Sequence, residues 1–131
     1  AYTAQQWRLS RSLDGGKTFK AIFEDTHATN PPPLEADSKG NLYLARCDFV
    51  GGDAYFYRFT TGHLDQSPAI TTIPGGAAGK VCLGLDEPRQ QIYFFSHNNS
   101  FHILSLDGTL KRSVTLLKAG PHGILQYPLL T

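Results

Sequence analysis

The sequence contains no methionine, two cysteines and no apolar run approaching twenty residues. A membrane-spanning helix requires about 20 mostly apolar residues, so the sequence predicts none. Lysine and arginine are scattered along the chain and the formal net charge is +1, so the sequence shows no basic patch of the kind that binds nucleic acid. A signal-peptide pattern is also missing. Because the chain begins at Ala1, we expect that it has been processed or excised from a longer polypeptide.

The two cysteines, Cys47 and Cys82, have a spacing that matches no zinc-binding pattern. We expect both to be buried thiols, and the sequence leaves open a disulfide between neighbouring strands. The rest of the composition is ordinary. Hydrophobic residues make up 40% of the chain and charged residues 18%, which suits one hydrophobic core. We therefore interpret residues 1–131 as a single domain.

The stretch 12–19 gives the strongest structural signal. It has the sequence Ser-Leu-Asp-Gly-Gly-Lys-Thr-Phe and lies between two short runs that alternate apolar and polar residues. Glycine tolerates the positive φ angles of tight turns, so the stretch predicts a β-hairpin. The side chains of Ser12, Asp14 and Thr18 can bond back to the turn, which predicts a rigid loop. Phe19 is expected to cover the hairpin as a small lid.

The same residues resemble the Asp-box of sialidases and other BNR-repeat proteins. The resemblance implies a β-propeller in which this hairpin lies at the outer rim of a blade, far from the ligand site. It therefore implies a structural role for the motif. The pattern is Ser-x-Asp-x-Gly-x-Thr-aromatic, and its signature positions are filled by Ser12, Asp14, Gly16, Thr18 and Phe19.

Internal repeats favour the same architecture. Asp37 and Tyr43 recur as an Asp and a Tyr 49 and 50 positions later, each time around a polar turn that leads into an apolar strand. The tetrapeptide Ser-Leu-Asp-Gly at 12–15 recurs at 105–108, 93 positions later. A unit of about 47 residues is in the range of a four-stranded propeller blade.

The repeat predicts strands throughout the chain and no helix. We divide the chain into blade equivalents 1–24, 33–73 and 80–117, followed by a lone inner strand at 123–130. Three blades do not close a ring, because known propellers have about four to eight. We expect the remaining blades of a longer chain, or a second copy, to complete it. The predicted strands are 1–5, 7–12, 19–24, 33–37, 41–47, 54–60, 69–73, 80–85, 91–96, 100–105, 111–117 and 123–130.

Two histidines form the main site hypothesis. His27 and His122 lie 95 positions apart, and each is followed by Pro-Leu six and seven residues later. Both precede a predicted inner strand, which predicts that they face the mouth of the central channel. Imidazole is the commonest metal ligand and changes its protonation near neutral pH. The pair is therefore a candidate site for a divalent metal ion or for an acidic sugar.

The stretch from His27 to Tyr43 also resembles the blade motif of BNR-repeat polysaccharide lyases. That resemblance implies a His, a Tyr and an Arg that act at a uronate before β-elimination. Only His27 is carried over by motif, because the second channel histidine, expected about twenty residues later, falls at Cys47 or Asp48. The Phe-Arg-Ile-Pro motif of sialidases does not precede the hairpin.

Further ligand-binding candidates lie on or beside predicted inner strands: Asn30, Tyr43, Arg46, Asp48 and Arg58. A complete catalytic set cannot be assembled from these residues. We therefore predict a module that recognises carbohydrate or protein in a secreted, periplasmic or other extracellular setting. Two alternatives stay open. One is a part of a glycan-active enzyme, sialidase-like or lyase-like, and the other is a scaffold whose channel binds nothing.

Overall fold

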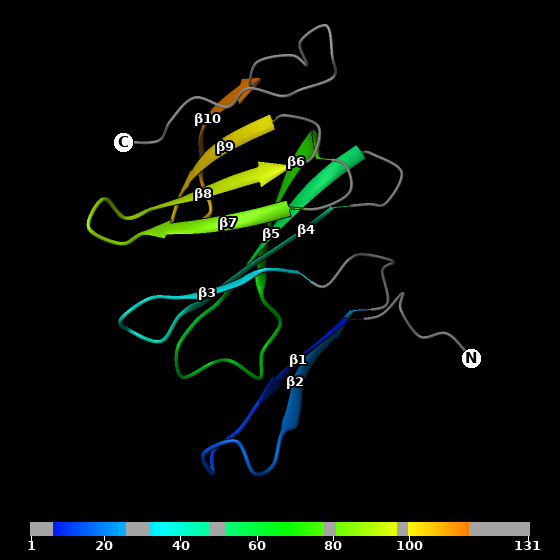
Figure 1. The fold of residues 1–131 in the computed structure, drawn as a ribbon, viewed down its shortest axis with the longest axis vertical. Coiled ribbons are helices and arrows are strands. Elements are labelled where there is room, and N and C mark those ends of the chain that lie inside the picture. The colour runs from blue at the N-terminus through cyan, green and yellow to red at the C-terminus, as the bar shows by residue number, and fades with distance from the viewer. Residues whose placement is uncertain (1–6, 26–31, 48–51, 78–80, 97–99, 116–131) are drawn as a thin grey trace, which may run out of the picture.

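The computed structural model describes five segments of the chain: 7–25, 32–47, 52–77, 81–96 and 100–115. These segments form strands joined by turns, and within them there is no helix, so the predicted all-β fold is confirmed (Figure 1). The strands are β1 (Trp7–Arg11), β2 (Lys20–Asp25), β3 (Leu34–Ala36), β4 (Leu42–Cys47), β5 (Gly52–Phe59), β6 (Ala69–Ala77), β7 (Val81–Asp86), β8 (Gln91–Ser96), β9 (Ser100–Ser105) and β10 (Leu110–Thr115).

Every strand predicted within the described segments is present. The largest difference is in β6, which continues to Ala77 instead of ending at Ile73. The predicted strands at 1–5 and 123–130 lie outside the described residues. The described part contains no helix long and apolar enough to cross a membrane.

The strands form three antiparallel sheets, and within each sheet the strands that pair are consecutive in the chain. The N-terminal hairpin is β1–β2, the middle sheet has the order β3-β4-β5-β6, and the C-terminal sheet consists of β7 to β10 in the same consecutive order. Figure 1 shows the three sheets following one another along the long axis of the molecule. This consecutive pairing is what the repeated strand–turn–strand pattern predicts.

The middle sheet packs on both of its faces, which explains why β4 and β5 are apolar almost continuously. Successive side chains of a strand point to opposite faces. One face contributes Leu44, Tyr57 and Phe59 to a core with Trp7 and Leu9 of the N-terminal hairpin. The other face packs on the C-terminal sheet in a second core made of Tyr43, Ala45, Cys47, Ala54, Phe56, Ile73, Ile92, Phe94 and Leu104.

The turn between β1 and β2 bonds to itself as predicted. Gly16 N–H donates to Ser12 Oγ at 2.8 Å, and Thr18 donates its amide and its hydroxyl to the Asp14 carboxylate at 2.9 and 2.5 Å. The hydroxyl and the amide of Thr18, followed by the Ser12 hydroxyl, lower the pKa of Asp14 to about 2. The prediction that Phe19 forms a lid is wrong, because its side chain is 67% exposed.

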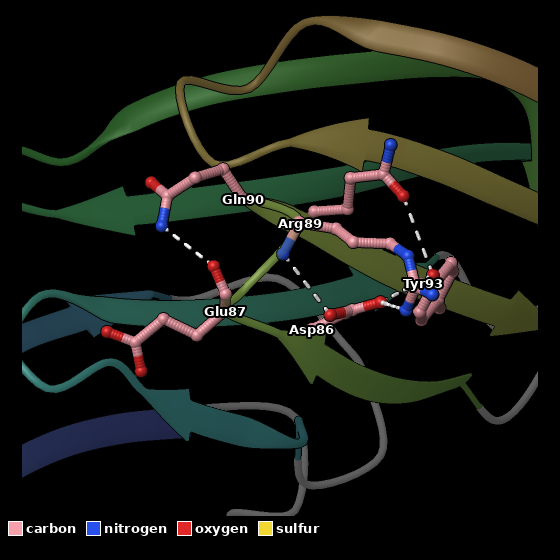
Figure 2. A network of polar contacts seen from close by, with 6 residues as sticks. Asp86, Glu87, Arg89, Gln90 and Tyr93 are labelled. Carbon is pink, nitrogen blue, oxygen red and sulfur yellow. Dashed lines mark hydrogen bonds and ion pairs between the residues drawn. The ribbon is translucent and has the colours of Figure 1, made fainter.

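The repeat found in the sequence is also a repeat of side-chain contacts. Tyr43 donates its hydroxyl to Asp37 at 2.9 Å, and Tyr93 donates to Asp86 at 2.9 Å. Figure 2 shows the second of these turns, where Arg89 also donates to the Asp86 carboxylate at 2.9 Å. The Arg89 hydrogen bond, with that of Tyr93, lowers the pKa of Asp86. Asp37 and Asp86 therefore anchor equivalent turns of two equivalent sheets.

The two sheets also repeat an aromatic stack. The rings of Tyr43 and Phe56 are 6.0 Å apart with an interplanar angle of 9°, and those of Tyr93 and Phe101 are 5.7 Å apart with an angle of 20°. In each sheet the stack joins the second strand to the third. The stacks therefore mark the equivalent face in each sheet.

A glycine lies where the middle and C-terminal sheets touch. Gly108 has a φ of 92°, and a Cβ at this position would lie 2.7 Å from Thr71 Oγ1 and 2.9 Å from Arg58 Nε. Thr71 Oγ1 donates to the Gly108 carbonyl at 2.7 Å across the contact. Gly15, at the same place in the repeated tetrapeptide, has a φ of 72° but nothing within 4 Å of a Cβ. Of these two glycines, only Gly108 thus combines a positive φ with a close approach.

The cysteine prediction is half wrong. Cys47 is buried in the core between the middle and C-terminal sheets, as expected. Cys82 lies on β7 but is exposed, and both residues are thiols. The reason is that Cys82 occupies the position of β7 that points away from the middle sheet, whereas its neighbours Val81 and Leu83 pack against the core.

Candidate functional site

The structure describes only part of the site predicted from the sequence. His27, Asn30, Asp48 and His122 lie outside the described residues, so the proposed metal or sugar site at a central channel stays a prediction. Among the described residues, no group of three or more His, Cys, Asp or Glu side chains could hold a metal ion. Tyr43 and Arg46 are described, and the structure places them on opposite faces of β4.

Arg46 is enclosed between the middle sheet and the N-terminal hairpin. Its side chain is 3% exposed, and Nε donates to Tyr57 Oη at 2.7 Å. Tyr57 in turn donates to Asp25 Oδ2 at 3.0 Å, and Arg46 Nε lies 3.7 Å from the same oxygen. The guanidinium carbon is also 4.1 Å from the centre of the Tyr55 ring, a cation–π contact. These contacts join β2 to β4 and β5.

Burial decides the electrostatics of this cluster. Burial, and to a smaller extent the bond to Asp25, raises the pKa of Tyr57 to about 12, while Arg46 opposes the change. Tyr57 therefore stays a neutral donor over the physiological range. The charge of Arg46 is balanced by a carboxylate that is itself only 10% exposed. A guanidinium held in this way fixes two sheets together and is not presented to a ligand.

A groove opens at the other end of the middle sheet, where its turns meet those of the C-terminal sheet. It has a volume of about 250 Å³. Charged and amide side chains dominate the lining, which comes from the β3–β4 turn, the end of β5, the β7–β8 turn and the β9–β10 turn. The lining residues are Asp37, Lys39, Asn41, Tyr43, Arg58, Phe59, Thr60, Glu87, Gln90 and Leu106.

Hydrogen bonds between the two sheets hold the groove in shape. Ser38 donates its amide to Glu87 Oε1 at 3.0 Å, and its hydroxyl contacts the same oxygen. The Leu106 amide donates to the Gln90 carbonyl at 3.2 Å, which ties the β9–β10 turn to the β7–β8 turn. Gln90 has a φ of 54°, a left-handed conformation that is uncommon for a residue other than glycine. The walls are therefore built from fixed turns.

Tyr43 and Asp37 form one wall of the groove. The Asp37 carboxylate accepts from the Asn41 side-chain amide at 2.8 Å and from the Tyr43 hydroxyl at 2.9 Å. Burial alone would raise the pKa of Asp37, but the bonds from Asn41, Tyr43 and nearby amides outweigh it and lower the pKa. Burial, with the bond to Asp37, raises the pKa of Tyr43 to about 12. This wall is a fixed pair of an ionised acceptor and a neutral phenol.

Arg58 differs from the other groups of the groove. Its Nη1 donates to the Leu106 carbonyl at 3.4 Å, which is a long bond. Its Nε is buried and has no hydrogen-bond partner among the described residues. A buried donor without a partner costs free energy, of the order of 1–3 kcal/mol. Nε is enclosed beside Gly108, and Arg58 lines the groove with the rest of its side chain.

The described carboxylates whose pKa values are shifted all have lowered pKa values. The pKa values of Asp14 and Asp107 are lowered to about 2, first by the hydroxyls of Thr18 and Ser105 respectively. Asp37 and Asp86 also have lowered pKa values. A general acid that works near neutral pH needs a raised pKa. All four of these carboxylates therefore act as turn anchors.

Sequence reasoning did not find the groove. The sequence marked Arg58 and Tyr43 as residues that could face a ligand, but Glu87 and Gln90 lie in a turn that gives no sequence motif of its own. The repeated Asp–Tyr pair was a further signal, because Tyr43 lies in the wall of the groove. Comparison of the chain with protein-family models, with curated proteins and with solved structures finds no match, so the candidate site rests on its geometry.

Proposed function

We propose that this chain is a segment of an Asp-box β-propeller that recognises carbohydrate, and that the groove holds one hydroxyl-rich unit of the ligand. The architecture that supports the propeller is a pair of four-stranded antiparallel sheets with the same Asp–Tyr bond and the same aromatic stack in each.

The side chain of Arg58, which lines the groove and makes one long hydrogen bond, carries the proposal. A guanidinium offers five N–H groups in a fixed plane and suits pairs of hydroxyl or carboxylate oxygens. In this groove the positive groups of Arg58 and Lys39 face the negative groups of Asp37 and Glu87. Because the charges balance, a neutral sugar fits better than a strongly anionic one.

The size of the groove sets the extent of the contact. Sites for drug-sized molecules have volumes of roughly 300–1,000 Å³. A volume of about 250 Å³ has room for one small polar unit, with the rest of an oligosaccharide lying outside. Glu87 and Gln90 supply acceptors beside the Arg58 donors, which matches the mixed donor and acceptor character of a sugar hydroxyl.

Recognition, not catalysis, is the proposed activity. The described carboxylates with shifted pKa values are all ionised turn anchors, and none lies in the groove with a raised value. The secreted or periplasmic setting suggested by a glycan ligand stays part of the proposal.

Isothermal titration calorimetry with neutral and uronate-containing oligosaccharides tests the proposal. The intact chain should bind a neutral oligosaccharide, and Arg58→Met should weaken that binding at least tenfold. Arg89→Met is the matched control, because Arg89 belongs to a turn that lines the groove while its own side chain is 74% exposed and pairs with Asp86 (Figure 2). This variant should bind as the parent does.

Variants at the alternative site make the result decisive. His27→Ala and His122→Ala should leave binding in the groove unchanged. If they abolish binding and Arg58→Met does not, the ligand lies at the predicted channel mouth. Binding of none of the oligosaccharides by a folded sample would refute carbohydrate recognition.

A further inference from the structure

The tip of the N-terminal hairpin, residues 11–20, presents apolar side chains to solvent. Leu13 is 83% exposed and Phe19 is 67% exposed, the two highest values among the large apolar side chains of the described residues. Both line one groove of about 160 Å³, together with Ile22 and Thr18. Single exposed apolar residues are common on protein surfaces, but apolar residues that gather in one place mark a contact with another molecule or with a membrane.

Positive charges border this groove. Arg11 and Lys20 line it, and they are direct partners in the last pair of the β1–β2 ladder. Directly opposed like charges repel each other, and neither side chain has an ion pair with a described residue. Lys17 is a third exposed cation, and the single carboxylate of the tip, Asp14, already accepts two bonds from Thr18. The tip is therefore complementary to a surface of negative charge.

The order of these groups along the hairpin separates the apolar end from the charged part. Leu13 lies in the turn, beyond the last ladder pair, whereas Arg11 and Lys20 lie on the strands behind it. Figure 1 shows this turn at the lower end of the molecule, away from the middle and C-terminal sheets. A surface that is apolar at its outermost point and basic behind it matches an anionic bilayer, whose phosphates lie above the acyl region.

We infer that the hairpin tip docks on membranes rich in anionic phospholipid, with Leu13 and Phe19 at the acyl boundary and Arg11 and Lys20 at the phosphates. The size of the tip favours a bilayer over the alternatives. A groove of about 160 Å³ does not enclose a whole small ligand, whose pockets have roughly 300–1,000 Å³. A standard protein interface has about 20–30 residues on each side, more than the tip contains. A fluid bilayer needs no matching surface.

Co-sedimentation with vesicles tests the charged part of the contact. The intact chain should bind phosphatidylcholine vesicles that contain one third phosphatidylserine at least tenfold more tightly than pure phosphatidylcholine vesicles, and high salt should weaken this binding. Each cation near an anionic surface contributes about fivefold, so the double variant Arg11→Gln and Lys20→Gln should bind more than tenfold more weakly. The matched control is the double variant Lys111→Gln and Arg112→Gln, which removes two exposed cations from β10 and should bind as the parent does.

A fluorescence measurement tests the apolar part. Phe19→Trp should be quenched by phosphatidylserine vesicles with brominated acyl chains, whereas the parent should not, because its single tryptophan, Trp7, is 7% exposed. Leu13→Ser should weaken vesicle binding severalfold. Ile70→Ser is the matched control, since Ile70 is an apolar residue of β6 that is 53% exposed away from the tip. Circular dichroism checks that every variant is folded.

The outcomes that overturn the inference are distinct. Equal binding to both kinds of vesicle, or no binding by a folded sample, excludes docking on anionic lipid. Binding that requires Arg11 and Lys20 but leaves the introduced indole unquenched shows that the tip does not insert, and an acidic protein surface then becomes the better occupant. The inference does not depend on the carbohydrate groove, which lies at turns of the other two sheets, so failure of oligosaccharide binding leaves these results unaffected.

Discussion

Arg46 and Arg58 lie on neighbouring strands of one sheet, yet their surroundings are opposite. Arg46 is 3% exposed and contacts Tyr57, Asp25 and the Tyr55 ring. Arg58 faces a groove, makes one long bond to a carbonyl and leaves Nε without a partner among the described residues. The contrast teaches that a buried charge whose bonds are satisfied serves the fold, whereas a guanidinium that lines a groove and makes a single long bond is the better candidate for a ligand contact.

The largest expected effect is at the enclosed arginine. Asp25→Ala removes the carboxylate that accepts from Tyr57 and lies 3.7 Å from Arg46 in a buried cluster, and should destabilise the protein by about 3–5 kcal/mol. Urea unfolding followed by circular dichroism measures the loss. Adding Arg46→Met to Asp25→Ala should recover part of the stability, because the buried charge that faced Asp25 is then removed as well. If the double variant is less stable than Asp25→Ala, Arg46 contributes mainly through packing and the comparison fails.

At Arg58 we expect a small effect of substitution on stability and a large effect on ligand affinity. Arg58→Met removes a buried donor without a partner, so the free energy of unfolding should change by no more than about 1 kcal/mol. Oligosaccharide affinity should still fall. The same urea titration gives the stability, and calorimetry gives the affinity. A loss of several kcal/mol would place Arg58 with Arg46 as a structural residue.

The turn at Asp14 provides a third case for the comparison, because its network of polar contacts is exposed to solvent. Asp14→Ala removes the acceptor of both Thr18 bonds and should lower the melting temperature while leaving ligand affinity unchanged. Asp107→Ala should act in the same direction at the β9–β10 turn, where the Thr109 amide donates to Asp107 at 2.9 Å. Reduced affinity at an unchanged melting temperature would show that the turn contacts the ligand.

The smallest effect should be a change with pH. The pKa of Asp14 is about 2 when the protein is folded and 3.8 without its partners, so the folded state favours the ionised form. The stabilisation is therefore complete above about pH 4 and is lost as the pH falls from about 4 to about 2. The difference in melting temperature between the parent and Asp14→Asn should shrink over this interval. A difference that persists at pH 2 would assign the effect to turn geometry.

Local chemistry explains what the sequence could predict. Alternating side chains, glycine-rich turns and the Asp–Tyr bond at each repeated turn depend on contacts within one strand–turn–strand unit. They correctly predicted the strands of the described segments and the self-bonded turn at Asp14. Propensity and spacing are sufficient there because each partner lies within a few residues of the other.

Contacts between sheets explain what the sequence could not predict. Asp25 reaches Arg46 across 21 positions, and Ser38 reaches Glu87 across 49, so neither pair has a motif. Cys82 looked like Cys47 because both lie in apolar strands, and only the stacking of the sheets makes one buried and the other exposed. Phe19 was assigned to a lid because it is aromatic, but the hairpin presents it to solvent.

The contact at Gly108 limits which residues can lie where the middle and C-terminal sheets touch. At Gly15 the backbone alone sets the limit, so asparagine, which tolerates a positive φ, is an acceptable replacement. At Gly108 every side chain would push Thr71 and Arg58 aside and wedge the sheets apart. Two copies of one tetrapeptide thus differ in tolerance. Gly15 can be replaced by a residue that accepts a positive φ, whereas any side chain at Gly108 would disturb the contact between the two sheets beside the groove.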